Sequence, residues 1–206
     1  MVDTSTKELT DQAAEIRSEI LRCAHDLFCH YGFNKTNIGD IAKCCNMSPG
    51  NLYRYYRNKQ AIGLAAVQQY FDAAEAAMET ELLLSEGDAE DRIRRFLTTG
   101  IRHIVDELRR NPKMVELAEF LCEDEQGLKI LDAHISWKRE LMARELQKGM
   151  SDGVLAPRDP ERTASTVLNG LKMFWMPMTL ARWRDPSTIM PELEELLDLM
   201  FRGLRT

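Results

Sequence analysis

One segment of the sequence, Asn46 to Lys59, constrains the fold more than any other. It opens with a strong helix start, because the Ser48 hydroxyl can accept a hydrogen bond from a free amide of the first turn and Pro49 has no amide to leave unpaired. A second short helical segment, Thr36 to Cys45, precedes it. Two short helices joined by a tight turn form a helix-turn-helix.

The second helix of this pair has an apolar stripe and a polar surface. Leu52 and Tyr56 stand four residues apart, so they share one face and can pack on the preceding helix. Polar residues lie outside this stripe, and packing of a hydrophobic core does not require them. Their side chains can form hydrogen bonds with base edges and phosphates. We expect Asn51 and Arg54 to read bases, and Thr36, Tyr53 and Lys59 to hold phosphates. The full set expected at DNA is Thr36, Asn37, Ser48, Pro49, Gly50, Asn51, Tyr53, Arg54, Tyr55 and Lys59.

The charge distribution supports a nucleic-acid partner. The whole chain has a net charge of −6, which by itself argues against one. Between Gly32 and Lys59, however, basic residues outnumber acidic ones, and Asp40 is the lone acid. Positive charge is therefore concentrated where the helix-turn-helix lies, and the rest of the chain carries the acidic excess.

The segment resembles the DNA-binding domain of the TetR/AcrR family of bacterial transcriptional regulators. The residues that carry the resemblance are Ile20, Ala24, Leu27, Phe28, Gly32, Phe33, Thr36, Ile41, Ala42, Ser48, Gly50, Leu52, Tyr53, Tyr56 and Lys59. Two positions depart from the family pattern. Asn46 stands where the family usually has glycine, although asparagine also tolerates the left-handed backbone of a tight turn. Tyr55 replaces the common histidine, which leaves that DNA contact open.

Beyond this motif the spacing of apolar residues predicts further helices, and no alternating strand pattern is present. A long helix is expected from about Asn58 to Leu84. Later helices are expected to start at Asn111-Pro112, Asp159-Pro160 and about Pro191, and to end near Gly153 and at Met176 before Pro177. The expected fold is all-α, with an N-terminal helix-turn-helix DNA-binding domain over residues 1–57. The resemblance implies a C-terminal helical ligand-binding and dimerisation domain over residues 58–206.

The last two long helices are apolar on more than one side. One chain buries two such faces with difficulty, so a four-helix interface between two copies is expected. The family resemblance implies the same homodimer, and a dimer can read both halves of a palindromic operator. The residues expected at this interface are Val167, Leu171, Phe174, Trp175, Leu193, Leu197, Met200 and Leu204.

Large, adaptable and polar-tipped side chains gather in the central helices. In the family a small-molecule pocket lies within the C-terminal helices, and methionine, aromatic and histidine side chains suit such a pocket. The residues expected to bind a ligand are Phe96, His103, Phe120, His134, Trp137, Met142, Met173 and Met176. An ordinary place in the core explains any one of them equally well.

Composition narrows the remaining classes of function. No apolar run approaches the ~20 residues of a membrane span, and the N-terminus is polar, so we expect a soluble cytoplasmic protein without a membrane partner. The five cysteines fit neither a disulfide framework nor a zinc motif, so we expect thiols, no metal and no cofactor. No phosphate loop or nucleophile motif indicates an enzyme.

Together these features predict a ligand-responsive repressor. It is expected to bind a palindromic operator as a homodimer and to be released by a small, mostly apolar effector. A thiol- or metal-responsive regulator is the alternative, since His25 and Cys29 lie four residues apart on one helix. A non-specific architectural DNA protein would lack a reason for the large acidic body.

Overall fold

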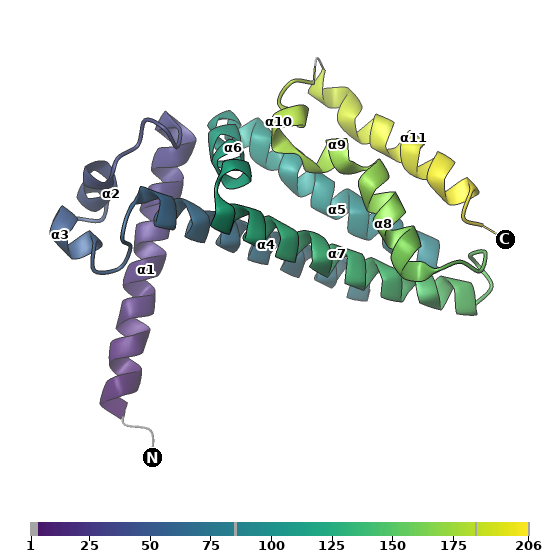
Figure 1. Ribbon diagram of the computed structural model, residues 1–206, viewed down its shortest axis with the longest axis horizontal. Coiled ribbons are helices and arrows are strands. Elements are labelled where there is room, and N and C mark those ends of the chain that lie inside the picture. The colour runs from purple at the N-terminus through teal and green to yellow at the C-terminus, as the bar shows by residue number, and fades with distance from the viewer. Residues whose placement is uncertain (1–3, 85, 184, 206) are drawn as a thin grey trace.

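The computed structural model describes residues 4–84, 86–183 and 185–205, and these fold almost entirely into helices (Figure 1). The first three residues of the expected N-terminal domain lie outside the described residues. A small head at one end consists of α1 (Thr4–Tyr31), α2 (Ile38–Cys44) and α3 (Pro49–Leu52). An elongated body consists of α4 (Lys59–Leu84), α5 (Ala89–Arg110), η1 (Pro112–Met114), α6 (Val115–Glu123), α7 (Glu125–Ser151), α8 (Pro160–Gly170), α9 (Lys172–Trp175), α10 (Pro177–Leu180), η2 (Pro186–Thr188) and α11 (Ile189–Arg202). The all-α prediction is confirmed, and no helix within the described ranges is long and apolar enough to cross a membrane.

Capping side chains fix the two short helices of the head. The Asn37 side-chain oxygen accepts from the Asp40 amide at 3.0 Å, while the Asp40 carboxylate accepts from the Asn37 amide at 3.2 Å. The Ser48 hydroxyl accepts from the Asn51 amide at 3.2 Å, as the sequence predicts. Each cap satisfies an amide that the helix itself leaves without a partner.

The turn between these helices depends on Asn46. Its φ of +53° lies in the left-handed region, so asparagine here adopts the backbone that a glycine would allow. The second helix is shorter than expected, because regular helix ends at Leu52 and the chain continues in turns through Tyr55. The helix-turn-helix is nevertheless formed where the sequence places it.

The hydrophobic core of the head extends beyond residue 57. Its members from the first three helices and their loops are Ile20, Ala24, Phe28, Phe33, Ile41, Ala42, Leu52 and Tyr56. The same cluster includes Ile62 and Val67 from α4 and Leu117 and Leu121 from α6. Helices α4 and α6 of the body therefore complete the core of the head. The expected domain boundary at residue 57 separates residues that pack in one core.

A second core fills the body. It includes Met78, Ile93, Phe96, Leu97, Ile101, Met142, Leu146, Leu168, Leu180 and Phe201. The side chains of Asp88, Asp124 and Asp159 accept from first-turn amides of α5, α7 and α8, so these helices begin at capping residues. Asn111 was expected to be a cap and is not, because its side-chain amide donates to Glu107 at 2.8 Å instead.

The helix expected from Asp159 to Met176 is broken into pieces. Helix α8 ends at Gly170, α9 follows, and Pro177 occupies the first turn of α10. A Cβ at Gly170 would lie 2.7 Å from the Met200 Cε, so glycine allows α8 and α11 to approach closely at this point. The kink at Pro177 was predicted, but the earlier break was not.

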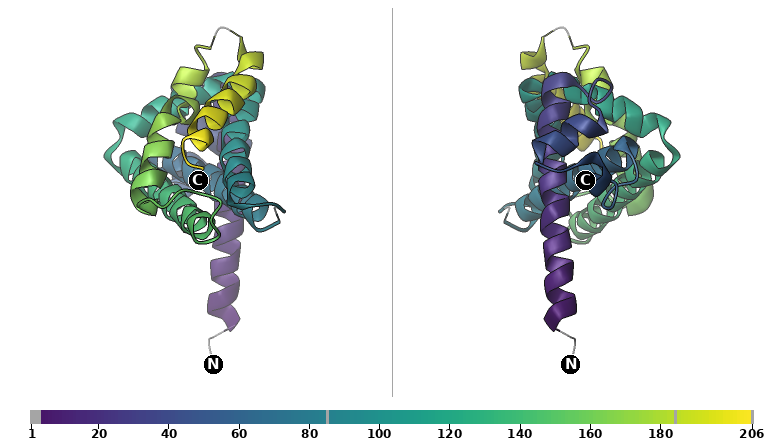
Figure 2. Two further views of the ribbon diagram at one scale, coloured as in Figure 1. Left: turned by 90° about the vertical axis from the view of Figure 1, so that its right-hand side faces the viewer. Right: turned by 90° about the vertical axis from the view of Figure 1, so that its left-hand side faces the viewer.

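Most of the residues predicted for a dimer interface lie inside a single chain, and for them the prediction is wrong. Val167, Leu171, Phe174, Leu193 and Leu197 are each at most 3% exposed and belong to the body core. Helix α8 packs against α7, and α11 packs against α5, so each apolar face has a partner within the chain. Figure 2 shows α8 and α11 at the end of the body away from the head. Trp175, Met200 and Leu204 are only partly buried.

Candidate nucleic-acid interface and ligand cavity

The polar surface of the helix-turn-helix is accessible. Asn37, Ser48, Pro49, Gly50, Tyr53 and Arg54 are exposed, and Asn51 and Tyr55 are half-buried. A Cβ at Gly50 would meet no atom within 4 Å, so the start of α3 is open to the close approach of a partner. Eight of the ten residues predicted for DNA therefore remain available to bases or phosphates.

Thr36 is not available in this way. It is 2% exposed, and its hydroxyl donates to the Gly32 carbonyl at 2.8 Å, next to the Leu27 carbonyl at 3.4 Å. The Gly32 carbonyl directly follows α1 and also accepts from the Thr36 amide at 3.3 Å, and the Leu27 carbonyl lies in the last turns of α1. Thr36 therefore closes the end of α1, which corrects the prediction that it holds a phosphate.

Lys59 is also engaged within the protein. Its ammonium donates to the Phe33 carbonyl at 2.7 Å and the Asn34 carbonyl at 3.3 Å, and lies 4.5 Å from the centre of the Phe33 ring. Burial lowers the pKa of Lys59. The side chain therefore fixes the start of α4 to the loop after α1, and its contact with a phosphate stays a prediction.

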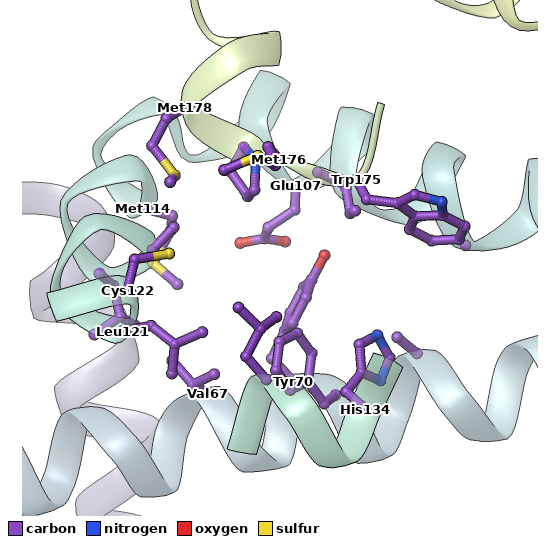
Figure 3. A pocket seen from close by; sticks show the side chains of 18 of the residues that line it. Val67, Tyr70, Glu107, Met114, Leu121, Cys122, His134, Trp175, Met176 and Met178 are labelled. Carbon is purple, nitrogen blue, oxygen red and sulfur yellow. The ribbon is translucent and has the colours of Figure 1, made fainter. Parts of the chain in front are cut away.

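A cavity of about 190 Å³ lies inside the body (Figure 3). Its walls come from α4, α5, η1, α6, α7 and the α9–α10 segment. Residues that line it include Val67, Tyr70, Met114, Leu121, Cys122, Trp175, Met176 and Met178. The walls are mainly apolar, with a few polar groups, as is usual for a small-molecule site.

Only two of the eight residues predicted for the ligand line this cavity among the described residues, His134 and Met176. Phe96 and Met142 are each 1% exposed in the body core, and Met173 is 45% exposed on the surface. The other three pack beside wall or head residues: Phe120 stacks on Phe33, His103 lies against Tyr70, and Trp137 stacks on His134. Phe96 and Met142 lie in the core and not in the wall, because helical spacing cannot tell a cavity wall from the core behind it. For Phe120, His103, Trp137 and Met173 a ligand contact stays a prediction.

The sequence argument missed the polar residues of the cavity. Figure 3 shows the Glu107 carboxylate and the Tyr70 hydroxyl directed into it. The neighbouring His25 ring and the Asn111 amide lower the pKa of Glu107 to about 2 despite its burial, so it is a carboxylate at neutral pH. Burial raises the pKa of Tyr70, which keeps its hydroxyl protonated. No signal in the sequence singled out either residue.

Two lysines of the cavity wall, Lys138 and Lys172, were also missed, and Lys138 is the buried one. It lies one helical turn after His134 and is 4% exposed. Burial, with a smaller effect of the Lys138 charge, lowers the pKa of His134 to about 3. The neutral imidazole therefore donates from Nδ1 to the Glu75 carboxylate at 2.6 Å. A lysine one turn from an expected wall histidine was a usable signal.

The cavity and the head share structural elements. Leu117 and Leu121 of α6 belong to the core of the head and also line the cavity. Glu107 lines the cavity, and its carboxylate lies 3.7 Å from Nε2 of His25 on α1. The Asn34 amide donates to the Glu116 carboxylate of α6 at 2.9 Å. A displacement of α6 by a ligand would therefore act directly on the packing of the head.

One group of side chains could hold a metal ion. The ligand atoms of His25, Cys29 and Glu107 all lie within 4.8 Å of one another, where α1 meets α5. The buried cysteines of the head differ, because burial raises the pKa values of Cys23 and Cys45. Protonated thiols are weak nucleophiles and weak metal ligands.

Comparison with known proteins identifies both regions. Residues 20–66 match a family model described as bacterial regulatory proteins of the tetR family. Residues 89–196 match a model described as the tetracyclin repressor-like C-terminal domain. The chain is 31% identical over 80 residues to the HTH-type transcriptional repressor NemR of Escherichia coli (strain K12), and this alignment covers 38% of the chain and 40% of NemR.

Solved structures share the fold over nearly the whole chain. A transcriptional regulator from Cytophaga hutchinsonii gives a TM-score of 0.73 at 18% identity, covering 91% of this chain and 97% of that one. A TetR-family regulator from Pectobacterium atrosepticum gives 0.71 at 21% identity, covering 95% and 97%. The two family matches, with an exposed helix-turn-helix in the matching place, show that this chain belongs to the TetR family of DNA-binding transcriptional regulators and is not an enzyme.

Proposed function

We propose that this regulator is a cytoplasmic repressor that binds a palindromic operator as a homodimer and is released by a small, mostly apolar effector. The observation that carries the proposal is the double role of Leu117 and Leu121, which contact both the cavity and the core of the head. Repression is favoured because NemR, which is 31% identical over 80 residues, is named a repressor.

The proposed mechanism is a competition between two conformations. Two recognition helices must lie about 34 Å apart to enter successive major grooves of an operator. An effector that fills the cavity would move α6 and disturb the contact between Glu107 and His25, which tilts the head. Operator affinity then falls by linkage, because DNA and effector favour different conformers.

The proposed dimer uses the outward faces of α11 and of the short helix α9. In the single chain Leu199 is 60% exposed and Met173 is 45% exposed, while Leu196, Met200 and Leu204 are partly buried. These side chains leave an apolar surface beside the intramolecular core. Two copies of it would form the four-helix interface that this family uses.

A screen tests effector control directly. Small apolar and amphipathic compounds are first tested for binding to the DNA-free protein by thermal shift, and the binders are then tested for release of a fluorescent operator. The proposal expects binders that weaken the operator complex by about 1–3 kcal/mol. A screen in which many compounds bind the protein and none changes operator affinity would contradict it.

Arg54→Ala is expected to weaken binding to the preferred operator by about 1–3 kcal/mol and to relax its sequence preference. Arg54 is exposed beside α3 and has no contact that the fold requires. Arg144→Ala, which removes an exposed positive charge far along α7, is the matched control and should leave operator binding unchanged. Fluorescence anisotropy measures both, and equal binding by Arg54→Ala and wild type would disprove the readout assignment.

His25→Ala is expected to uncouple the effector from DNA. It removes the ring beside Glu107 but leaves the cavity wall intact, so an effector found in the screen should bind the DNA-free protein with unchanged affinity. The effector should weaken operator binding less in His25→Ala than in the wild-type protein, where the expected coupling is about 1–3 kcal/mol. If the effector weakens operator binding equally in His25→Ala and in the wild type, the contact between His25 and Glu107 does not couple the cavity to the head.

A metal-responsive regulator is the second candidate, supported by the His25, Cys29 and Glu107 group. Nε2 of His25 lies 3.6 Å from the Cys29 sulfur and 3.7 Å from the Glu107 oxygen. Ligand atoms around a tetrahedral zinc ion are separated by about 3.5 Å, given bond lengths of about 2.0–2.3 Å. Zinc titration by calorimetry, with Cys29→Ser as control, tests this. An operator affinity that is the same in zinc and in chelator would rule it out.

A further inference from the structure

The cavity is lined by a buried lysine, Lys138, that forms no direct ion pair with the described residues. Lys138 is 4% exposed, and its ammonium makes no hydrogen bond or ion pair with any described residue. Its close contact is with the face of Trp175, 3.8 Å from the ring centre. Burial lowers the pKa of Lys138 to about 7, and the Glu75 charge opposes this shift only in part.

The nearby carboxylates are already committed elsewhere. Glu75 accepts from Nδ1 of His134 at 2.6 Å and does not line the cavity. Glu107 does line the cavity and is directed into it, but its carboxylate accepts from the Asn111 amide at 2.8 Å and lies 3.7 Å from Nε2 of His25. Lys138 therefore forms no direct ion pair with either carboxylate, although the Glu75 charge favours its protonated form.

One further feature suits a negatively charged guest. Lys172 also lines the cavity and is exposed, so it adds positive potential where an anion would arrive. The remaining walls are mainly apolar and offer little to a polyvalent or strongly hydrated anion.

We propose that the effector is a small monocarboxylate whose apolar part fills the cavity and whose carboxylate accepts a hydrogen bond from the Lys138 ammonium. This inference rests on the proposed effector site and names its ligand class. An apolar cavity of about 150 Å³ accommodates benzene. At about 190 Å³, this cavity suits a molecule of the size of benzoate or hexanoate.

The first experiment compares carboxylates with neutral molecules of the same shape. Benzoate and hexanoate are titrated by calorimetry into the full-length, DNA-free protein, next to benzamide and hexanamide. Each carboxylate is expected to bind about tenfold or more tightly than its amide, because a charge-assisted hydrogen bond replaces a neutral one. Equal affinities, or no binding by either carboxylate at millimolar concentration, would overturn the proposal.

The second experiment removes the cation. Lys138→Met should lose about tenfold or more in benzoate and hexanoate affinity while binding the amides as before, and its melting temperature without ligand should rise because a buried charge is gone. Lys172→Met removes an exposed charge from the same cavity and should change carboxylate affinity much less. Carboxylate binding that survives Lys138→Met unchanged would also overturn the proposal.

Operator release is measured separately with the same compounds. If the carboxylates bind through Lys138 but leave operator affinity unchanged, the ligand class holds and effector control fails. If release occurs equally with the amides, effector control holds and the assignment of the carboxylate class fails. The two proposals therefore have different signatures.

Discussion

Leu197→Glu is expected to unfold the single chain, with a loss of about 4–5 kcal/mol in the free energy of unfolding. Leu197 is 0% exposed in the body core, where α11 packs on α5, so the new carboxylate would be buried without a partner. Urea unfolding followed by circular dichroism measures the loss. The sequence alone suggested a different outcome, a folded monomer split from its dimer.

Leu199→Glu is the matched variant on the same helix. Leu199 is 60% exposed in the single chain, so the substitution should change the free energy of unfolding by no more than about 0.5 kcal/mol. If the outward face of α11 forms the dimer, the new charge should dissociate it in sedimentation velocity at micromolar concentration. A Leu199→Glu protein that stays dimeric would remove this face from the interface, and a stably folded Leu197→Glu protein would contradict the assignment of Leu197 to the core.

Phe96→Ala is expected to cost about 3–5 kcal/mol of folding free energy. Phe96 is 1% exposed in the body core, and its ring contacts Trp137 with centres 5.8 Å apart. The truncation leaves a void that the packed helices fill only in part. Ligand and operator binding should therefore weaken together as the folded fraction falls, which thermal unfolding and anisotropy can follow in parallel.

Met176→Ala is the comparison within the cavity wall. Met176 is partly buried and lines the cavity, so its truncation should change stability by only about 1 kcal/mol. Ligand affinity should change, whereas operator affinity without ligand should not. If Phe96→Ala is as stable as the wild type but altered in ligand binding, Phe96 contacts the ligand and is not a core residue.

Local chemistry made the head predictable. The Ser48 cap, the left-handed Asn46 and the exposed Arg54 follow from interactions within a few residues of each position. Helix starts at Asp88 and Asp159 are predictable for the same reason. The contacts of Thr36 and Lys59 were not predictable, because their partners are carbonyls near the end of α1 and in the loop after it, and a sequence motif does not show whether a polar group is already bonded.

The sequence by itself determined the helical class, the helix-turn-helix and the place of most helix boundaries, since periodicity and capping act along one segment. Only the tertiary structure decided which apolar helix faces pack against other helices of the same chain. Leu193 and Leu197 pack on α5, so an interface drawn from their stripe was wrong. It also decided that Lys138 and Trp175 meet at one cavity. The physical reason is that a helical stripe specifies burial but not the neighbour, which is set by how distant helices pack.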